Sequence, residues 1–127
     1  MPDVRRPERS ARLAAGLRLM VLTDPSPACG RSLATVVAEC LDAGATSIQL
    51  RDKEATAREL YEMATELLPV VRARAALLFV NDRFDVALAA GADGVHLGPV
   101  DLPVREVRSR VPDGFLIGFS TDDPSLG

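Results

Sequence analysis

Ser47-Ile48-Gln49-Leu50-Arg51-Asp52-Lys53 has the pattern of a short β-strand that ends in a charged loop. Because side chains alternate across a strand, Ile48 and Leu50 are expected on one face and Gln49 and Arg51 on the other. Lys53 follows just beyond the end of the strand. A strand with a carboxamide and a guanidinium on one face and a lysine after its end is typical of the floor of an anion-binding site.

Strands and helices are expected to alternate along the rest of the chain. Apolar runs predict strands at 17–22, 47–51, 77–80, 94–98 and 115–119. Apolar residues at helical spacing predict four helices between the strands. The first covers 33–41 with Gly44 as its cap, and the second begins at a capping box formed by Thr56 and Glu59. The third covers 84–90 and ends at Gly91, and the fourth has Pro103 in its first turn. Pro69 should either end or kink the second helix.

This alternation predicts an α/β fold in which parallel strands are joined by right-handed crossovers. Two architectures fit, a partial TIM (β/α) barrel of about five strands and four helices and a flavodoxin-like open parallel sheet. The length of 127 residues favours the open sheet, because a whole barrel takes about 250 residues. We expect a single domain, 1–127, with a polar arm at 1–12 and the (β/α) units at 17–121.

Composition excludes several classes of protein. The chain has 15 Lys and Arg against 18 Asp and Glu, and its basic residues are dispersed, which argues against a nucleic-acid partner. The apolar run from Leu13 to Leu22 is interrupted by Arg18 and is too short for a membrane span or a signal sequence. Cys29 and Cys40 are expected to be reduced thiols. These features predict a cytoplasmic protein without a membrane partner.

Polar residues follow the predicted strands, at the edge where α/β proteins gather their functional groups. They are Thr23-Asp24, Arg51-Asp52-Lys53, Asn81-Asp82 and Gly118 to Thr121. Arg51 and Lys53 suit a phosphate group, although Lys53 could instead pair with Asp52 or Glu54.

The remaining candidates have two interpretations each. Asp82 and Asp101 fit helix N-caps, but two carboxylates from neighbouring loops also fit a Mg²⁺ site. His96 could be a hydrogen-bonded core residue or could line a site, and Ser120 could bind an anion or make a turn.

An ordered set of motifs between residues 17 and 121 resembles the thiamine phosphate synthase family. The motifs are Thr23-Asp24, Gln49-Leu50-Arg51-Asp52-Lys53, Asn81-Asp82-Arg83, Gly91-Ala92-Asp93-Gly94-Val95-His96-Leu97-Gly98, Asp101-Leu102-Pro103 and Gly118-Phe119-Ser120-Thr121. The resemblance implies a TIM barrel that couples hydroxymethylpyrimidine diphosphate with thiazole phosphate and releases pyrophosphate.

The same resemblance assigns residues to roles. It implies that the pyrimidine diphosphate is bound by Gln49, Leu50, Arg51, Asp52, Lys53, Asn81 and Ser120. It implies that Asp82 and Asp101 hold Mg²⁺ as the cofactor, and His96 is a candidate to line the site.

The chain departs from the family pattern at three places. Pro99-Val100 stands where the family often has Gln-Glu, Asp122 stands where it commonly has His, and strands six to eight, with their later Lys, are absent. We therefore expect an incomplete form, the N-terminal half of the enzyme, with open barrel edges that invite a homo-oligomer or a separate C-terminal half as partner. Whether this chain alone is an active enzyme is left open.

Two alternatives remain. One is a non-catalytic diphosphate-binding module. The other is a protein like the related thiazole tautomerases, which generally lack the Asp of the Asp-Leu-Pro turn and use a His that this chain does not have.

Overall fold

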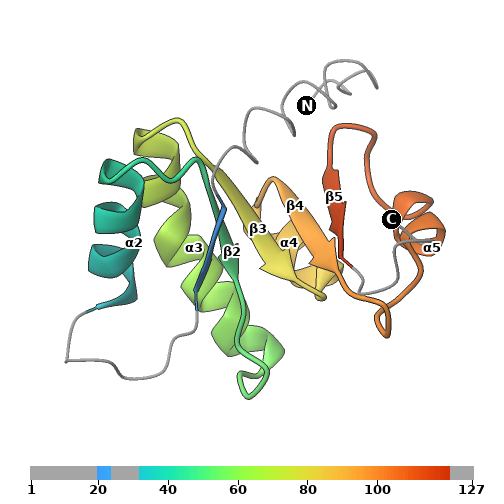
Figure 1. Ribbon diagram of the computed structural model, residues 1–127. Helices are drawn as coiled ribbons and strands as arrows, with labels where there is room; N and C mark the ends of the chain where they lie inside the picture. Colours follow the sequence, from blue (N-terminus) through green and yellow to red (C-terminus); the bar gives the residue numbers. More distant parts are fainter. Residues whose placement is uncertain (1–19, 24–31, 121–127) are drawn as a thin grey trace.

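The computed structural model describes the backbone of residues 20–23 and all of residues 32–120. Its elements are β1 (Met20–Thr23), α2 (Leu33–Asp42), β2 (Ser47–Leu50), α3 (Ala57–Ala73), β3 (Leu77–Asn81), α4 (Phe84–Ala90), β4 (Gly94–Leu97), α5 (Val104–Arg108) and β5 (Leu116–Phe119) (Figure 1). The predicted arm at 1–12, the start of the first strand at Leu17, and Asp24, Cys29, Thr121 and Asp122 lie outside the described residues.

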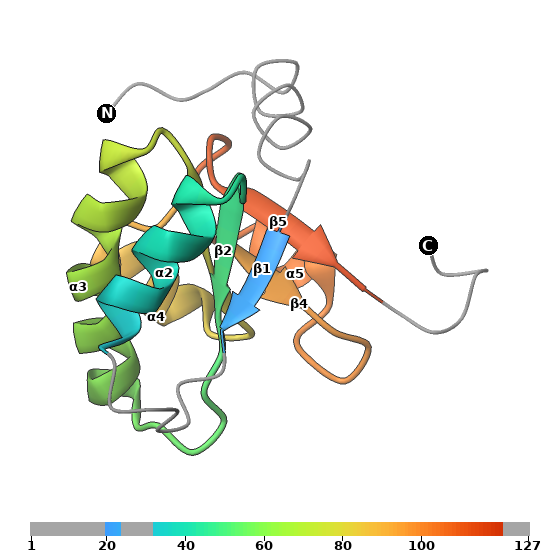
Figure 2. The same cartoon turned by 60° about the vertical axis from the view of Figure 1, so that its left-hand side comes forward.

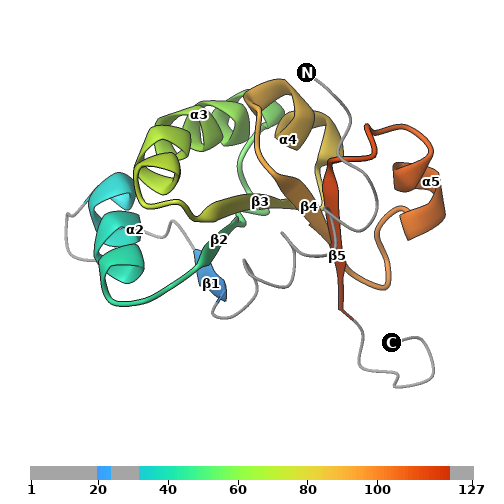
Figure 3. The ribbon, with the colours of Figure 1, turned by 90° about the horizontal axis from the view of Figure 1, so that it is seen from above.

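All five strands are parallel and lie in the order β1-β2-β3-β4-β5, so each strand pairs with the next one along the chain. A flavodoxin-like sheet would place β1 between β2 and β3, which this order excludes. Figure 3, viewed from above, shows a curved sheet with α2, α3 and α4 on its outer side. The partial (β/α) barrel is therefore confirmed.

The outer face of the sheet carries the core. The strand residues Ile48, Leu50, Leu78, Val80, Val95 and Leu97 pack there with Val37 of α2, with Leu60, Ala64, Leu67 and Val71 of α3, and with Val86 and Ala87 of α4. Each of these strand residues is fully buried. Burial of a branched aliphatic side chain contributes about 1.5–3 kcal/mol, so this layer is the main source of stability.

The inner face is built in two layers that follow from the strand register. Gln49, Phe79, Gly94 and Leu116 are register partners in one layer, and Asn81, His96 and Gly118 form the next, nearer the C-terminal ends of the strands. The first layer is closely packed, since a Cβ at Gly94 would collide with the backbone of Leu116. The second layer is polar, and it faces the candidate site.

The capping box of α3 forms as predicted, because the Glu59 N–H donates to Thr56 Oγ1 at 3.1 Å and the Thr56 N–H donates to Glu59 Oε1 at 3.0 Å. Pro69 does not end α3, which continues to Ala73. Pro69 lies on the exposed side of the helix, where water can bond to the carbonyl group that lacks its N–H partner. The predicted end of α4 at Gly91 is confirmed, with φ at 81°.

The last helix differs from the prediction. Pro103 occupies the N-cap of α5 rather than its first turn, and the helix ends at Arg108. The Arg108 guanidinium donates to the carbonyl groups of Phe115, at 2.7 Å, and of Pro112. These bonds hold the loop after α5 in a turn, so Val111 packs on the core from outside the helix.

A buried carboxylate joins the other end of the sheet to α3. Asp93, just before β4, accepts from Arg72 Nη1 at 2.7 Å and from the Leu78 N–H at 2.8 Å. Its side chain is only 3% exposed. Asp93 therefore fixes the position of α3 against β3 and β4, far from the polar layer.

Candidate functional site

A cavity of about 800 Å³ lies at the C-terminal ends of the strands. Its lining residues come from the inner face of the sheet, from the loops after β2, β3, β4 and β5, and from α3. They are Gln49, Arg51, Asp52, Lys53, Ala55, Leu60, Asn81, Asp82, Arg83, His96, Gly98, Pro99, Val100, Asp101 and Ser120.

All of the site residues predicted from the sequence line this cavity except Leu50. The Leu50 side chain is fully buried in the core on the opposite face of β2, as strand alternation requires. Any contact between Leu50 and a ligand in the cavity would have to come from its backbone. Figure 2 shows β1 and β2 running side by side, so that their C-terminal ends lie together.

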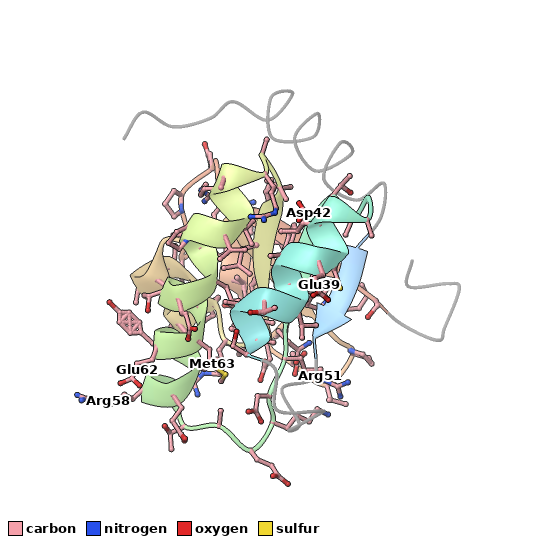
Figure 4. All side chains as sticks on the ribbon, turned by 90° about the vertical axis from the view of Figure 1, so that its left-hand side faces the viewer. Glu39, Asp42, Arg51, Arg58, Glu62 and Met63 are labelled. Atoms are coloured by element: carbon pink, nitrogen blue, oxygen red, sulfur yellow. The ribbon has the colours of Figure 1, made fainter. Side chains whose placement is uncertain are left out.

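The basic side of the cavity is formed by Arg51 and Lys53. Figure 4 places Arg51 at the end of β2. Neither side chain has an ion pair or hydrogen bond with another described residue, whereas Asp52 Oδ1 accepts from the Glu54 N–H at 3.0 Å. Lys53 therefore does not pair with Asp52 or Glu54, which was the alternative interpretation, and both cations are available to bind an anion.

Two carboxamides lie between the basic and acidic sides. Asn81 Nδ2 donates to Gln49 Oε1 at 3.2 Å. Gln49 is almost fully buried on the inner face of β2, so this bond fixes its orientation. The two linked carboxamides therefore form a polar part of the cavity wall, in which the assignment of O and N follows from the hydrogen-bond network.

Asp82 and Asp101 form the acidic side, and neither caps a helix. Arg83, not Asp82, is the N-cap residue of α4, and Asp82 has a left-handed φ of 67°. Asp101 Oδ2 accepts from the Gly98 N–H at 2.6 Å, inside a turn that ends before α5. The N-cap interpretation was wrong for both residues, because the turns after β3 and β4 direct their carboxylates elsewhere.

The two carboxylates repel each other. Burial raises the pKa of Asp82, and the charge of Asp101 and a hydrogen bond with it raise the pKa further. Such a pair fits Mg²⁺, which is commonly held by one or two carboxylates together with phosphate oxygens and water. In the described part of the chain, no group of three or more His, Cys, Asp or Glu side chains is placed to hold a metal, so phosphate or water would have to complete the coordination.

His96 connects the acidic side to the last strand. Its Nε2 lies 3.0 Å from Ser120 Oγ, so the ring is hydrogen-bonded and also lines the cavity. Burial lowers the pKa of His96, although the charge of Asp101 opposes this, and the ring is therefore neutral at pH 7. The absence of a side chain at Gly118 makes room for the ring, because a Cβ there would lie 2.7 Å from His96 Nδ1.

Some cavity residues were not predicted from the sequence. Arg83 lines the cavity and pairs with Asp85 on the first turn of α4, at 2.8 Å between Nη2 and Oδ2. Its place in Asn81-Asp82-Arg83 was the available signal. Val100 is 94% exposed at the mouth of the cavity, and nothing in the sequence pattern marked it as a lining residue.

Comparisons with known proteins agree with this geometry. The family model described as thiamine monophosphate synthase matches residues 19–126. The chain is 49% identical over 105 residues to the thiamine-phosphate synthase of Methanoculleus marisnigri, covering 83% of this chain and 50% of that protein. It is 44% identical over 109 residues to the thiamine-phosphate synthase of Coprothermobacter proteolyticus, covering 86% of this chain and 52% of the relative.

A solved structure has the same fold. The thiamine phosphate pyrophosphorylase from Pyrococcus furiosus superposes with a TM-score of 0.76 at 42% identity, over 84% of this chain and 51% of the other. The chain thus spans about half the length of the relatives it matches. Within the described residues, no helix has the length and apolar character needed to cross a membrane. The chain belongs to the thiamine monophosphate synthase family.

Proposed function

We propose that this chain forms the pyrimidine-diphosphate and magnesium side of a thiamine phosphate synthase. The reaction joins hydroxymethylpyrimidine diphosphate to thiazole phosphate and releases pyrophosphate in thiamine biosynthesis. One observation carries the proposal: a single cavity has the unpaired cations Arg51 and Lys53 on one side and the carboxylates Asp82 and Asp101 on the other. A diphosphate with a divalent cation has the charges to bridge those two sides.

The residues have roles that follow from where charge develops. As the carbon–oxygen bond to the diphosphate breaks, negative charge grows on the leaving group, and Arg51 and Lys53 are already in place to meet it. Mg²⁺ held by Asp82 and Asp101 would neutralise part of the same charge. Gln49 and Asn81 would orient the pyrimidine, and Ser120, fixed by His96, would donate to a phosphate oxygen.

The proposal concerns the site that these strands build. Because the relatives are about twice as long as this chain, the coupling reaction as a whole is proposed for a protein that also supplies the thiazole-phosphate side. The open edge of β5 is the natural place for further strands to pair, from a partner chain or from a longer form of this one. The cytoplasmic location that the composition predicts is consistent with this biosynthetic role.

Calorimetric titration of the purified chain with pyrophosphate, with and without Mg²⁺, tests the proposal. We expect binding that requires Mg²⁺ and that weakens about 10-fold or more in Lys53→Ala, because a charge-assisted contact contributes about 1.5–3 kcal/mol. Arg110→Ala is the matched control, since Arg110 does not line the cavity and its side chain bonds to Glu106 of α5 and to Ser109 just after that helix. Equal affinity of the wild type and Lys53→Ala would contradict the assignment.

A second assay separates catalysis from binding. Hydroxymethylpyrimidine diphosphate and thiazole phosphate are supplied together and thiamine phosphate is measured. Mg²⁺-dependent binding without product would support a diphosphate-binding module, whereas turnover by this chain alone would show that the half-barrel contains everything the reaction needs.

A further inference from the structure

The turn that carries Asp82 has an unusual backbone. The Arg83 N–H donates to the Asn81 carbonyl at 2.7 Å, and the Phe84 N–H donates to the Asp82 carbonyl at 3.1 Å. Asp82 has a φ of 67°, and Arg83 has φ −87° and ψ 81°. These are two consecutive three-residue turns, and the first, with a positive φ, is the rare and strained form.

Strain of this kind persists only where neighbouring groups enforce it. A left-handed φ is strained for a residue other than glycine, although less so for Asp than for most. On the strand side, the Asp82 N–H donates to the His96 carbonyl at 2.8 Å, which fixes the entry to the turn on β4. The exit must be fixed separately, because α4 begins without any side-chain cap.

Arg83 and Asp85 supply the contact at the exit. Arg83 Nε donates to Asp85 Oδ1 at 3.1 Å and Nη2 donates to Oδ2 at 2.8 Å, so the pair is bidentate. The two side chains are 43% and 58% exposed, and an exposed ion pair contributes little to global stability. The pair is therefore better suited to fixing local geometry than to holding the fold together.

We propose that Arg83 and Asp85 are positioning residues, which hold the turn so that the Asp82 carboxylate converges with Asp101 on a divalent cation. This inference rests on the proposed function of the site. The bidentate pair joins the residue after Asp82 to the first turn of α4 and leaves few other conformations open to the turn. Without it, Asp82 can relax toward a more common φ and turn its carboxylate away from Asp101.

A competing explanation is that Arg83 contacts the diphosphate directly, since it lines the cavity. The Asp85→Ala variant separates the two. If Arg83 binds the anion itself, removal of Asp85 frees the guanidinium and leaves metal binding unchanged. If the pair positions Asp82, the same variant weakens metal binding although Arg83 is still present.

The test uses Mn²⁺ alone as the probe, with free Mn²⁺ measured by electron paramagnetic resonance during titration of the full 127-residue chain. We expect Arg83→Ala and Asp85→Ala each to weaken Mn²⁺ binding by up to about 5-fold, the factor that corresponds to the upper limit for an exposed ion pair. The double variant should bind no more weakly than either single variant, because both break the same pair. The thermal midpoint should shift by only a few degrees.

Arg74→Ala is the matched control. Arg74 makes a similar pair with Asp42, with 2.9 Å between Nε and Oδ1, and neither residue lines the cavity. Figure 4 shows Asp42 at the end of α2, well away from Arg51. Its loss should leave Mn²⁺ binding unchanged. Wild-type Mn²⁺ affinity in Asp85→Ala would overturn the inference, even if Arg83→Ala proved unstable.

Two further variants distinguish the failure of this inference from the failure of the proposed function. Asp82→Asn and Asp101→Asn remove the ligands themselves. If they keep wild-type Mn²⁺ affinity, the metal site is wrong. If they lose it while Asp85→Ala does not, the metal site stands and only the positioning role is refuted.

Discussion

Gly118→Ala is a one-carbon change that should disturb the polar layer of the cavity. Gly118 has no left-handed φ, so the backbone of β5 accepts alanine without strain. The added Cβ, however, would lie 2.7 Å from His96 Nδ1, 3.5 Å from Cε1 and 3.6 Å from Cγ. Because the ring is half-buried in the sheet, it has little freedom to move aside.

The size of the effect follows from these distances. Favourable contact begins at about 3.5 Å, so the ring must move by about 0.8 Å. A shift of that size would stretch the 3.0 Å bond between His96 Nε2 and Ser120 Oγ beyond its usual range of about 3.2 Å. Forced overpacking costs about 1–3 kcal/mol. For a chain of this size that corresponds to a fall in Tm of roughly 4–12 °C.

Thermal unfolding followed by circular dichroism measures this loss, and a double-mutant cycle with His96→Ala identifies its cause. When the ring is absent, the added Cβ has nothing to displace, and Gly118→Ala should then cost little. Ser120→Ala is the companion control, since it removes the same hydrogen bond without moving the ring and should cost about 1 kcal/mol or less. If Gly118→Ala is equally destabilising with and without His96, the steric argument is refuted.

Further predictions concern buried charge. Asp82→Asn should raise Tm at pH 7 and abolish Mn²⁺ binding, because it removes a carboxylate whose pKa is raised by burial and by Asp101. As the pH falls through that raised pKa, the wild-type Asp82 becomes protonated, and the difference in Tm between the variant and the wild type should disappear. Asp93→Ala should cost about 2–3 kcal/mol in urea unfolding without changing Mn²⁺ affinity, because it leaves the Leu78 N–H without its acceptor far from the cavity. Burial lowers the pKa of His96, so the unfolded chain binds more protons just below pH 6.5; stability should therefore fall as the pH drops from about 6.5 toward the folded-state pKa, and His96→Gln should flatten that slope.

The sequence predicted most of the sheet and nearly all of the polar residues that line the cavity, because both follow from strand periodicity. Alternation alone separates Gln49 from Leu50, and the C-terminal ends of parallel strands necessarily meet at one edge. Once Ser47–Leu50 is recognised as a strand, the side on which Arg51 lies is determined. The choice between a barrel and an open sheet needed the observed strand order, since both have the same alternation of elements.

The turns were the part that the sequence did not predict. Asp82 precedes a helix and has the residue type of an N-cap, yet its N–H bonds to His96 on the neighbouring strand, and that long-range contact helps to set its left-handed φ. The end of α5 at Arg108 likewise depends on the contact between Arg108 and the carbonyl group of Phe115, seven residues later. Neither contact is visible in a local pattern of residue types.

The bond between Asp101 Oδ2 and the Gly98 N–H bears on which cation the site would prefer. Because Asp101 Oδ2 already accepts from the backbone at 2.6 Å, bidentate coordination of a metal by this carboxylate would compete with that hydrogen bond. Ca²⁺ takes six to eight oxygen ligands and often both oxygens of a carboxylate, whereas Mg²⁺ is smaller, demands octahedral geometry and keeps several waters. At the proposed metal site, an Asp101 that offers one oxygen would therefore suit Mg²⁺ or Mn²⁺ better than Ca²⁺.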